Sequence, residues 1–333
     1  MDKIGKKRRL HKLSNPAGCF SMLAIDQRQS LRKMISSKTG ESPQNIKEEE
    51  LKHVKRVVSK NLSPKASAIL TDPIIGYSST WDVIAGETGV MLSIEQTGYA
   101  TVNQNERLTR LLLDWDVEKA LHAGADGIKL LLWYNKNASE ATLEHQTNVV
   151  MNIGAACERF AMPFVLEVVC YPLSDIKTTS PDYAHQKALG VIDAARTFSS
   201  PEFRVDLLKL EFPGNLKYVK EYKNASFHGG EVIHDISEVK DLCRQVDHAS
   251  EVPWVILSAG VEPEEFIENI KLCNDAGASG FLCGRAVWKD IIQYYPDEQT
   301  MQKFISKTAS QHFDMFLEAN QKAHPWFQRN MNR

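Results

Sequence analysis

Short apolar stretches recur along this chain of 333 residues, and each is followed by a longer amphipathic stretch. The apolar stretches are rich in β-branched residues and do not alternate strictly with polar ones, which is typical of strands buried on both faces of a parallel sheet. Eight such stretches are present, at residues 20–26, 67–72, 89–96, 127–134, 163–170, 207–213, 253–260 and 280–288. We expect each of them to form a strand.

The segments between these strands place apolar residues three and four positions apart and end at Gly or Pro, as amphipathic helices do. Residues 48–62, 116–126, 148–162 and 263–279 are examples. Successive strands start about 22 to 47 residues apart, the size of one strand–helix unit. Eight such units predict a closed (β/α)8 TIM barrel rather than a doubly wound open sheet, whose GxGxxG motif after the first strand is missing.

No linker, charge block or low-complexity tract interrupts this pattern, so we expect residues 1–333 to form a single domain. Residues 1 to about 15 are a basic extension before the first strand. Residues from about 300 to 325 predict a C-terminal amphipathic helix that closes the barrel.

Composition excludes several classes of protein. With 43% apolar and 25% charged residues, the chain is neither disordered, collagen-like nor a coiled coil. A formal charge of −2 gives no indication of a nucleic-acid or membrane partner. The apolar runs are shorter than the roughly 18 residues that span a bilayer. The basic N-terminus is not followed by an apolar run as in a secretory signal, so we expect a cytoplasmic protein.

The six cysteines are scattered without a CxxC spacing, and we expect all of them to be structural. The ten histidines show no HxH, HExxH or short His/Cys spacing, so we predict no dedicated metal site and no cofactor. Ligands gathered from distant strands would not be visible in such spacings.

Four charged residues lie in predicted strands among apolar neighbours: Asp26, Lys129, Glu167 and Lys209. A buried charge costs several kcal/mol unless it is paired or used. One such residue alone indicates a structural ion pair. Four together predict a catalytic group, because polar side chains at the C-terminal ends of barrel strands meet in one pocket. Glu211 and Asp72 are ambiguous between the two roles, and we leave them out of the predicted site.

Lysines and carboxylates in one pocket indicate amine and proton-transfer chemistry. Desolvation and a second nearby cation both favour a neutral lysine amine, which can attack a carbonyl and form a Schiff base. The carboxylates would then carry protons.

A phosphate site is predicted after the last two strands. The seventh predicted strand ends with Ser258 and Gly260, and the eighth contains Gly284 and Arg285 just before a helix opens. Barrels often bind phosphate at these two loops, where glycine allows close backbone approach and arginine matches the phosphate oxygens. The alternative is that these glycines only make tight turns.

From about residue 15 to about residue 290, the chain resembles the class I aldolases of the tagatose-1,6-bisphosphate aldolase (LacD) type. The strings that carry the resemblance are LAIDQR, ASAILTDP, EQTGY, GADGIKLLLWY, PFVLEVV, LLKLEFP, PWVILSAGV and GASGFLCGRAVW. The resemblance implies a (β/α)8 barrel in which Lys209 forms the Schiff base and Glu167 moves protons. It places Lys129 and Asp26 at further active-site positions, and Ser258, Gly260, Gly284 and Arg285 at the phosphate.

The first strand departs from the family pattern, because Gln29 stands where the tagatose enzymes usually have glycine in DQRG. Gln27 and Arg28 in the same loop are expected to contact the substrate hydroxyls or its distal anion. The second half of the chain is also similar to a sister group that cleaves 6-deoxy-6-sulfofructose 1-phosphate.

The predicted function is therefore a class I aldolase that cleaves a phosphorylated ketohexose, with tagatose 1,6-bisphosphate as the expected substrate. The alternatives are an aldolase or transaldolase acting on sulfofructose phosphate, a sensor that binds sugar phosphate without turnover, and a metal-dependent aldolase. The expected partner is a small sugar phosphate, and assembly into a homo-oligomer stays open.

Overall fold

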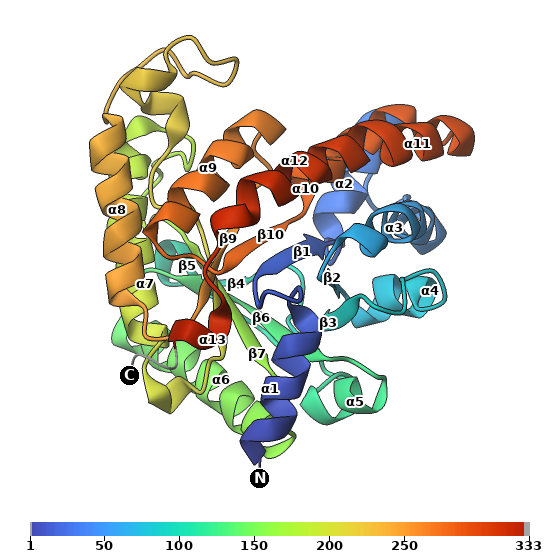
Figure 1. The fold of residues 1–333 in the computed structure, drawn as a ribbon, viewed down its shortest axis with the longest axis horizontal. Helices are drawn as coiled ribbons and strands as arrows, with labels where there is room; N and C mark the ends of the chain where they lie inside the picture. The colour runs from blue at the N-terminus through green and yellow to red at the C-terminus, as the bar shows by residue number, and fades with distance from the viewer. Residues whose placement is uncertain (1, 330–333) are drawn as a thin grey trace.

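The computed structural model describes residues 2–329, and its centre is a closed barrel of eight parallel strands (Figure 1). Neighbouring strands follow the order β1-β10-β9-β8-β7-β6-β3-β2, so the predicted TIM barrel is confirmed. In chain order the barrel strands are β1 (Phe20–Ala24), β2 (Ala68–Thr71), β3 (Gly89–Ser93), β6 (Gly127–Tyr134), β7 (Phe164–Cys170), β8 (Leu207–Leu210), β9 (Trp254–Leu257) and β10 (Gly280–Cys283).

Helices surround the barrel and connect its strands (Figure 1). They are α1 (Asp2–Leu13), α2 (Gln29–Thr39), α3 (Glu48–Leu62), α4 (Ser78–Thr80), α5 (Val117–His122), α6 (Glu140–Arg159), α7 (Pro181–Phe198), α8 (Ile236–Ala249), α9 (Pro263–Ala276), α10 (Arg285–Trp288), α11 (Glu298–Phe304), α12 (Ser310–Ala319) and α13 (Trp326–Arg329). The predicted helix over residues 48–62 forms with these bounds, and none of the helices described is long and apolar enough to cross a membrane.

Three features differ from the predicted pattern. The strand expected at 280–288 ends at Cys283, because Gly284 turns the chain with φ −126° and ψ −106° and α10 begins at Arg285. The predicted closing helix forms as α11 and α12, joined by a helical segment at 305–309. A hairpin follows β3 and consists of β4 (Ala100–Val102) and β5 (Glu106–Leu108). No apolar run in the sequence had indicated these two strands.

The N-terminal end of the barrel is closed by α1, which formed part of the predicted basic extension. Leu10 and Leu13 of this helix join a buried cluster with Phe20 and Met22 of β1 and Leu70 of β2. Lys6 of α1 contacts Asp206, with 2.9 Å between Nζ and Oδ2. The apolar barrel interior is therefore sealed at this end, and a polar site is left to the opposite end.

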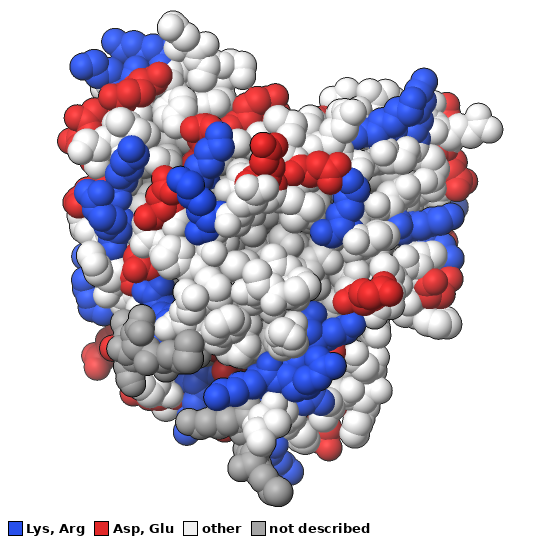
Figure 2. Space-filling view, viewed as in Figure 1, with Lys and Arg blue, Asp and Glu red and all other residues white. Residues whose placement is uncertain are grey.

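Charged side chains of both signs are interspersed over the face drawn in Figure 2, and a group of basic side chains gathers over α1, whose sequence is DKIGKKRRLHKL. The six cysteines are all buried and free, in agreement with the structural role predicted for them.

A fully buried ion pair supports the chain just before Asp26. Lys55 of α3 lies 2.8 Å from Asp72, measured from Nζ to Oδ2, and neither side chain is exposed. Lys55 also donates to the carbonyl oxygen of Ile25, and Asp72 accepts from the backbone N–H groups of Ile74, Ile75 and Gly76. Asp72 is therefore a structural residue that fixes the end of β2.

We predict that Lys55→Met destabilises the protein by about 3 to 5 kcal/mol, because Asp72 would stay buried without its cation. Lys52→Met is the matched control on the same helix, since the one ion pair of Lys52 with a described residue is a solvent-exposed contact with Glu49. Its cost should be within about 0.5 kcal/mol. The measurement is urea unfolding, and equal losses in the two variants would contradict the prediction.

Candidate active site

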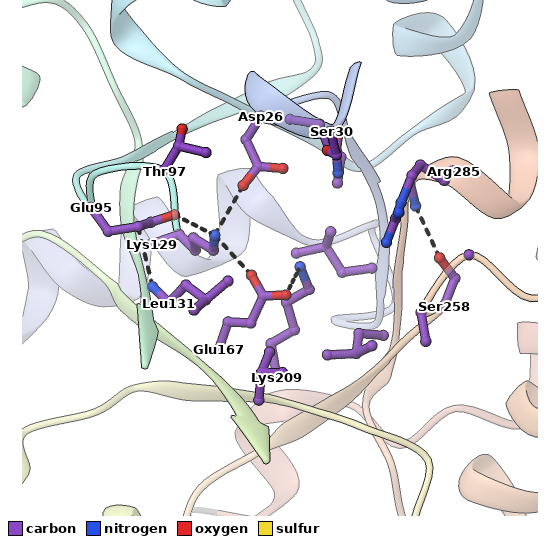
Figure 3. Close-up of a pocket in the computed structure, with 18 of the residues that line it drawn as sticks. Asp26, Ser30, Glu95, Thr97, Lys129, Leu131, Glu167, Lys209, Ser258 and Arg285 are labelled. Atoms are coloured by element: carbon purple, nitrogen blue, oxygen red, sulfur yellow. Dashed lines mark hydrogen bonds and ion pairs between the residues drawn. The ribbon is translucent and has the colours of Figure 1, made fainter. Parts of the chain in front are cut away.

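A cavity of about 440 Å³ opens at the C-terminal ends of the barrel strands (Figure 3). All ten predicted site residues line it: Asp26, Gln27, Arg28, Lys129, Glu167, Lys209, Ser258, Gly260, Gly284 and Arg285. These residues come from β1, β6, β7, β8, β9 and β10 or from the turns that follow these strands. Barrel closure therefore brings together residues that are up to 259 positions apart in the sequence.

Lys129 is at the centre of the charged group and is almost completely buried, with 1% of its side chain exposed. Its Nζ lies 2.9 Å from Oδ2 of Asp26, 2.6 Å from Oε1 of Glu95 and 2.8 Å from Oε2 of Glu167. Three carboxylates thus surround one ammonium group, as Figure 3 shows.

Glu167 connects the two lysines. Its Oε1 lies 2.9 Å from Nζ of Lys209, while its Oε2 contacts Lys129. Glu167 and Lys209 are Cα partners on the neighbouring strands β7 and β8, so both side chains leave their strands at the same height and on the same face. The strand register alone is enough to place this carboxylate beside this amine.

The field of the cluster favours the charged forms of Asp26, Glu167 and Lys129. Burial opposes ionisation of Asp26, but Lys129 and Lys209 lower the pKa of this carboxyl group to about 2. Burial likewise opposes ionisation of Glu167, and the same two lysines hold its pKa below the usual value. Burial favours the neutral form of Lys129, yet Asp26, Glu167 and Glu95 raise its pKa well above the usual value. Lys129 therefore remains a cation.

Glu95 is a site residue that we did not predict. It follows β3, its Oε1 contacts Lys129, and its Oε2 accepts from the backbone N–H of Leu131 at 3.1 Å. The signal was present, since Glu95 lies inside the predicted strand at 89–96 among apolar neighbours, as Asp26 and Lys129 do in theirs. The same test for charges in strands would have found it.

The loops after β9 and β10 are tied together at the predicted phosphate site. Ser258 Oγ accepts from the backbone N–H of Gly284 at 3.2 Å, which leaves its own O–H free to donate to another group. Gly260 has φ +77°, and a Cβ built on it would lie 3.5 Å from the guanidinium carbon of Arg285. Ala259 also has a positive φ, of 47°. A Cβ at that distance would make ordinary van der Waals contact with Arg285, so it is the positive φ that favours glycine at position 260.

Gln27 and Arg28 lie at the β1 side of the cavity. Arg28 donates from one terminal nitrogen to the carbonyl oxygen of Glu95 at 2.6 Å. The Arg28 Nε and the Gln27 Oε1 are buried and have no hydrogen-bond partner among the described residues. These two atoms are available to a bound molecule.

Glu211 lines the cavity as well, but it is directed toward β7. Its Oε2 accepts from the backbone N–H of Cys170 at 2.7 Å, and within residues 2–329 it makes no ion pair with a lysine. Burial raises the pKa of Glu211, against the opposing charge of Lys187. No group of three or more His, Cys, Asp or Glu side chains in the described part of the chain is placed to hold a metal ion.

The model of the DeoC/LacD family aldolases matches residues 20–290, which include the whole barrel and all the residues of this cavity. The chain belongs to the DeoC/LacD aldolases.

The relatives of this aldolase include tagatose 1,6-diphosphate aldolases. The chain is 33% identical over 326 residues to the enzyme of that name from Lactococcus lactis subsp. lactis, and the alignment covers 96% of this chain and 97% of that one. The enzyme of the same name from Staphylococcus epidermidis is 35% identical over 291 residues, covering 87% and 86%. The predicted resemblance to tagatose-bisphosphate aldolases is thus confirmed, and the similarity to the sulfofructose group stays a prediction.

Solved structures share the fold of this aldolase. The fructose-bisphosphate aldolase of Plasmodium falciparum superposes with a TM-score of 0.70 at 13% identity, covering 97% of this chain and 96% of that one. An archaeal fructose-1,6-bisphosphate aldolase, solved with its catalytic lysine bound to a carbinolamine intermediate, superposes with a TM-score of 0.56 at 14% identity, covering 92% and 99%.

The depressed pKa of Asp26 predicts a specific acid sensitivity. Its pKa in the folded state is about 2, against 3.8 ordinarily, so the ionised form stabilises the fold by about 2 kcal/mol. This contribution is complete above about pH 4 and is lost as the pH falls through about 2. Asp26→Asn should therefore reduce the fall in unfolding free energy over this range, measured by urea unfolding. Equally steep curves for both proteins would contradict it.

Proposed function

We propose that this aldolase uses Lys209 to form a Schiff base and cleaves tagatose 1,6-bisphosphate into dihydroxyacetone phosphate and glyceraldehyde 3-phosphate. The observation that carries the proposal is the Glu167 carboxylate between the two lysines, with Lys209 at one oxygen and Lys129 at the other. The names of the curated relatives support the substrate.

The two lysines have different roles in this proposal. Three carboxylates hold Lys129 as a cation, so it is not available as a nucleophile. Lys209 contacts only Glu167 among the described ionisable groups. Glu167 rests as a carboxylate, and transient transfer of a proton to it over that 2.9 Å contact leaves a neutral amine on Lys209. The neutral amine of Lys209 attacks C2 of the ketose, and Glu167 returns the proton as the carbinolamine loses water.

Cleavage then follows from the charge of the iminium. A base removes the proton of the C4 hydroxyl, the C4–O electrons form the aldehyde, and the C3–C4 bond breaks with its electron pair passing to the nitrogen as an enamine. Protonation at C3 and hydrolysis of the iminium release dihydroxyacetone phosphate and free Lys209. Glu167 is the proposed proton carrier, and Asp26 is a second carboxylate in contact with the Lys129 ammonium. Lys129 itself orients the hydroxyl groups.

The C1 phosphate is assigned to the paired loops after β9 and β10. Arg285 supplies charge, Gly260 and Gly284 allow close approach, and the Ser258 hydroxyl donates. Gln27 and Arg28, whose unpartnered atoms lie at the β1 side, are assigned to the hydroxyl groups or the distal anion.

The test of the nucleophile is borohydride trapping with dihydroxyacetone phosphate. We expect reduction to fix the ligand on Lys209, identified by peptide mass spectrometry, and no adduct in Lys209→Met. The same trapping is done with Lys129→Met. This variant loses the buried cation but keeps Lys209, so it separates loss of the cation from loss of the nucleophile. An adduct on Lys129 in the unmodified protein would reverse the two roles. The absence of any lysine adduct in the folded protein would refute the Schiff base.

The phosphate assignment predicts that Arg285→Ala raises KM for tagatose 1,6-bisphosphate at least about tenfold, the cost of a lost charged hydrogen bond. Steady-state cleavage, coupled to detection of the triose phosphates, measures the effect. Fructose 1,6-bisphosphate and 6-deoxy-6-sulfofructose 1-phosphate in the same assay test the choice of substrate, since all three carry the C1 phosphate. An unchanged KM would refute the assignment of Arg285.

A further inference from the structure

A second cavity, of about 490 Å³, adjoins the catalytic cavity and extends from the proposed phosphate loop away from the two lysines of the reaction. The two cavities share a wall, whose residues are Trp133, Val169, Glu211, Leu257, Ser258, Ala259 and Gly260. Lys209 and Glu167 do not line the second cavity, which lies between α7 and α9 beyond the ends of β7 and β8. A molecule bound there would be next to the substrate without touching the proposed nucleophile.

Three cationic side chains line this second cavity, and none of them has a carboxylate partner within ion-pair distance in the described part of the chain: Arg107, Lys187 and Lys217. The guanidinium of Arg107 is held between aromatic rings, with its carbon 4.4 Å from the ring centre of Tyr99, 4.9 Å from Trp133 and 4.8 Å from Tyr171. Ring faces fix the position of a guanidinium but leave its N–H groups free to donate in the plane.

Lys187 reaches the cavity from α7, one turn after Tyr183, which also lines it. Its ammonium makes no hydrogen bond with any described residue. Burial lowers the pKa of Lys187, against the field of Glu211, so an anion placed beside it would be favourable. The cavity therefore offers two cations on its β5 and α7 sides whose hydrogen-bonding capacity is unused.

The α9 side of the cavity carries acceptors. Glu265 and Asn269 lie one helical turn apart, each has only 3% of its surface exposed, and both line the cavity. Oε2 of Glu265 and Oδ1 of Asn269 are buried and have no hydrogen-bond partner among residues 2–329. A buried acceptor without a donor is unfavourable, so a ligand with hydroxyl donors would relieve this cost.

We propose that this second cavity is a binding site for a short phosphorylated polyol. The phosphate would accept from Arg107 and Lys187, and the hydroxyl groups would donate to Glu265 and Asn269. Anion donors at one end and hydroxyl acceptors at the other match a molecule that carries both groups. The site does not depend on the Schiff base of Lys209.

The experiment is calorimetric titration of the full chain carrying Arg285→Ala, which removes the phosphate grip of the catalytic cavity. The probes are glycerol 3-phosphate, inorganic phosphate and glycerol. We expect one saturable site for glycerol 3-phosphate, weakened about tenfold by Lys187→Met, which removes a charged hydrogen bond. Lys220→Met is the matched control, because Lys220 is exposed and does not line the cavity.

The acceptor side has its own readout. Glu265→Gln should weaken glycerol 3-phosphate and leave inorganic phosphate unchanged, because only the former carries hydroxyl groups, whereas Glu264→Gln on the exposed side of α9 should change neither. Lys187→Arg keeps the positive charge and should bind glycerol 3-phosphate more tightly than Lys187→Met does. This comparison separates loss of the charge from misfolding. The proposal is overturned if the Arg285→Ala protein shows no saturable binding, or if Lys187→Met and Lys220→Met bind glycerol 3-phosphate equally. Borohydride trapping on Lys209 succeeds or fails independently of either result.

Discussion

The buried charges at the C-terminal end of the barrel must be paired with charges of opposite sign, and the rest of the site depends on this constraint. Each ion removed from water costs several kcal/mol, and only close partners of opposite sign repay that cost. Lys129 has three such partners, which come from the ends of β1, β3 and β7. Glu167 then extends the network to Lys209 on β8. Because every member compensates another, the side chains are held in one arrangement before any substrate arrives.

This compensation also explains how the site can be reactive and stable together. In the proposed reaction, the substrate enters a cluster in which Glu167 and Lys209 are already in contact. Groups that are already fixed by one another need little rearrangement during such a reaction. The buried pair of Lys55 and Asp72 lies beneath this arrangement and fixes the backbone before Asp26, so a residue outside the cavity helps to position one inside it.

The barrel, and the meeting of the ten predicted residues in one cavity, could be foreseen from the sequence because strong signals indicated them. Buried parallel strands leave continuous apolar runs, and a charge inside such a run is conspicuous, as Asp26 and Lys129 were. The hairpin of β4 and β5 left no such signal, because its strands are short and half-exposed. The pairing of Arg28 with the carbonyl oxygen of Glu95 could not be foreseen either, since it depends on how a loop after β1 meets one after β3.

Charges in strands were informative only as a group. Asp72 and Glu211 had the same sequence context as the site residues, yet one caps a turn and the other binds the backbone of Cys170. The difference lies in the direction of a side chain relative to the backbone around it, which a sequence pattern does not record. The second cavity is a stronger example, because Arg107, Lys187 and Glu265 come from β5, α7 and α9 and share no motif.

The pairing of β1 with β10 has a consequence for synthesis of the protein. Phe20 lies opposite Gly280, so the contact that closes the barrel joins the first strand to the last. A chain emerging from the ribosome presents Asp26 early, but Arg285 follows only after nearly the whole barrel has been made. Until then β1 keeps an open edge able to pair with other strands. The nascent enzyme is therefore most exposed to aggregation just before its two ends meet, and the pairing that closes this edge also completes the proposed phosphate site.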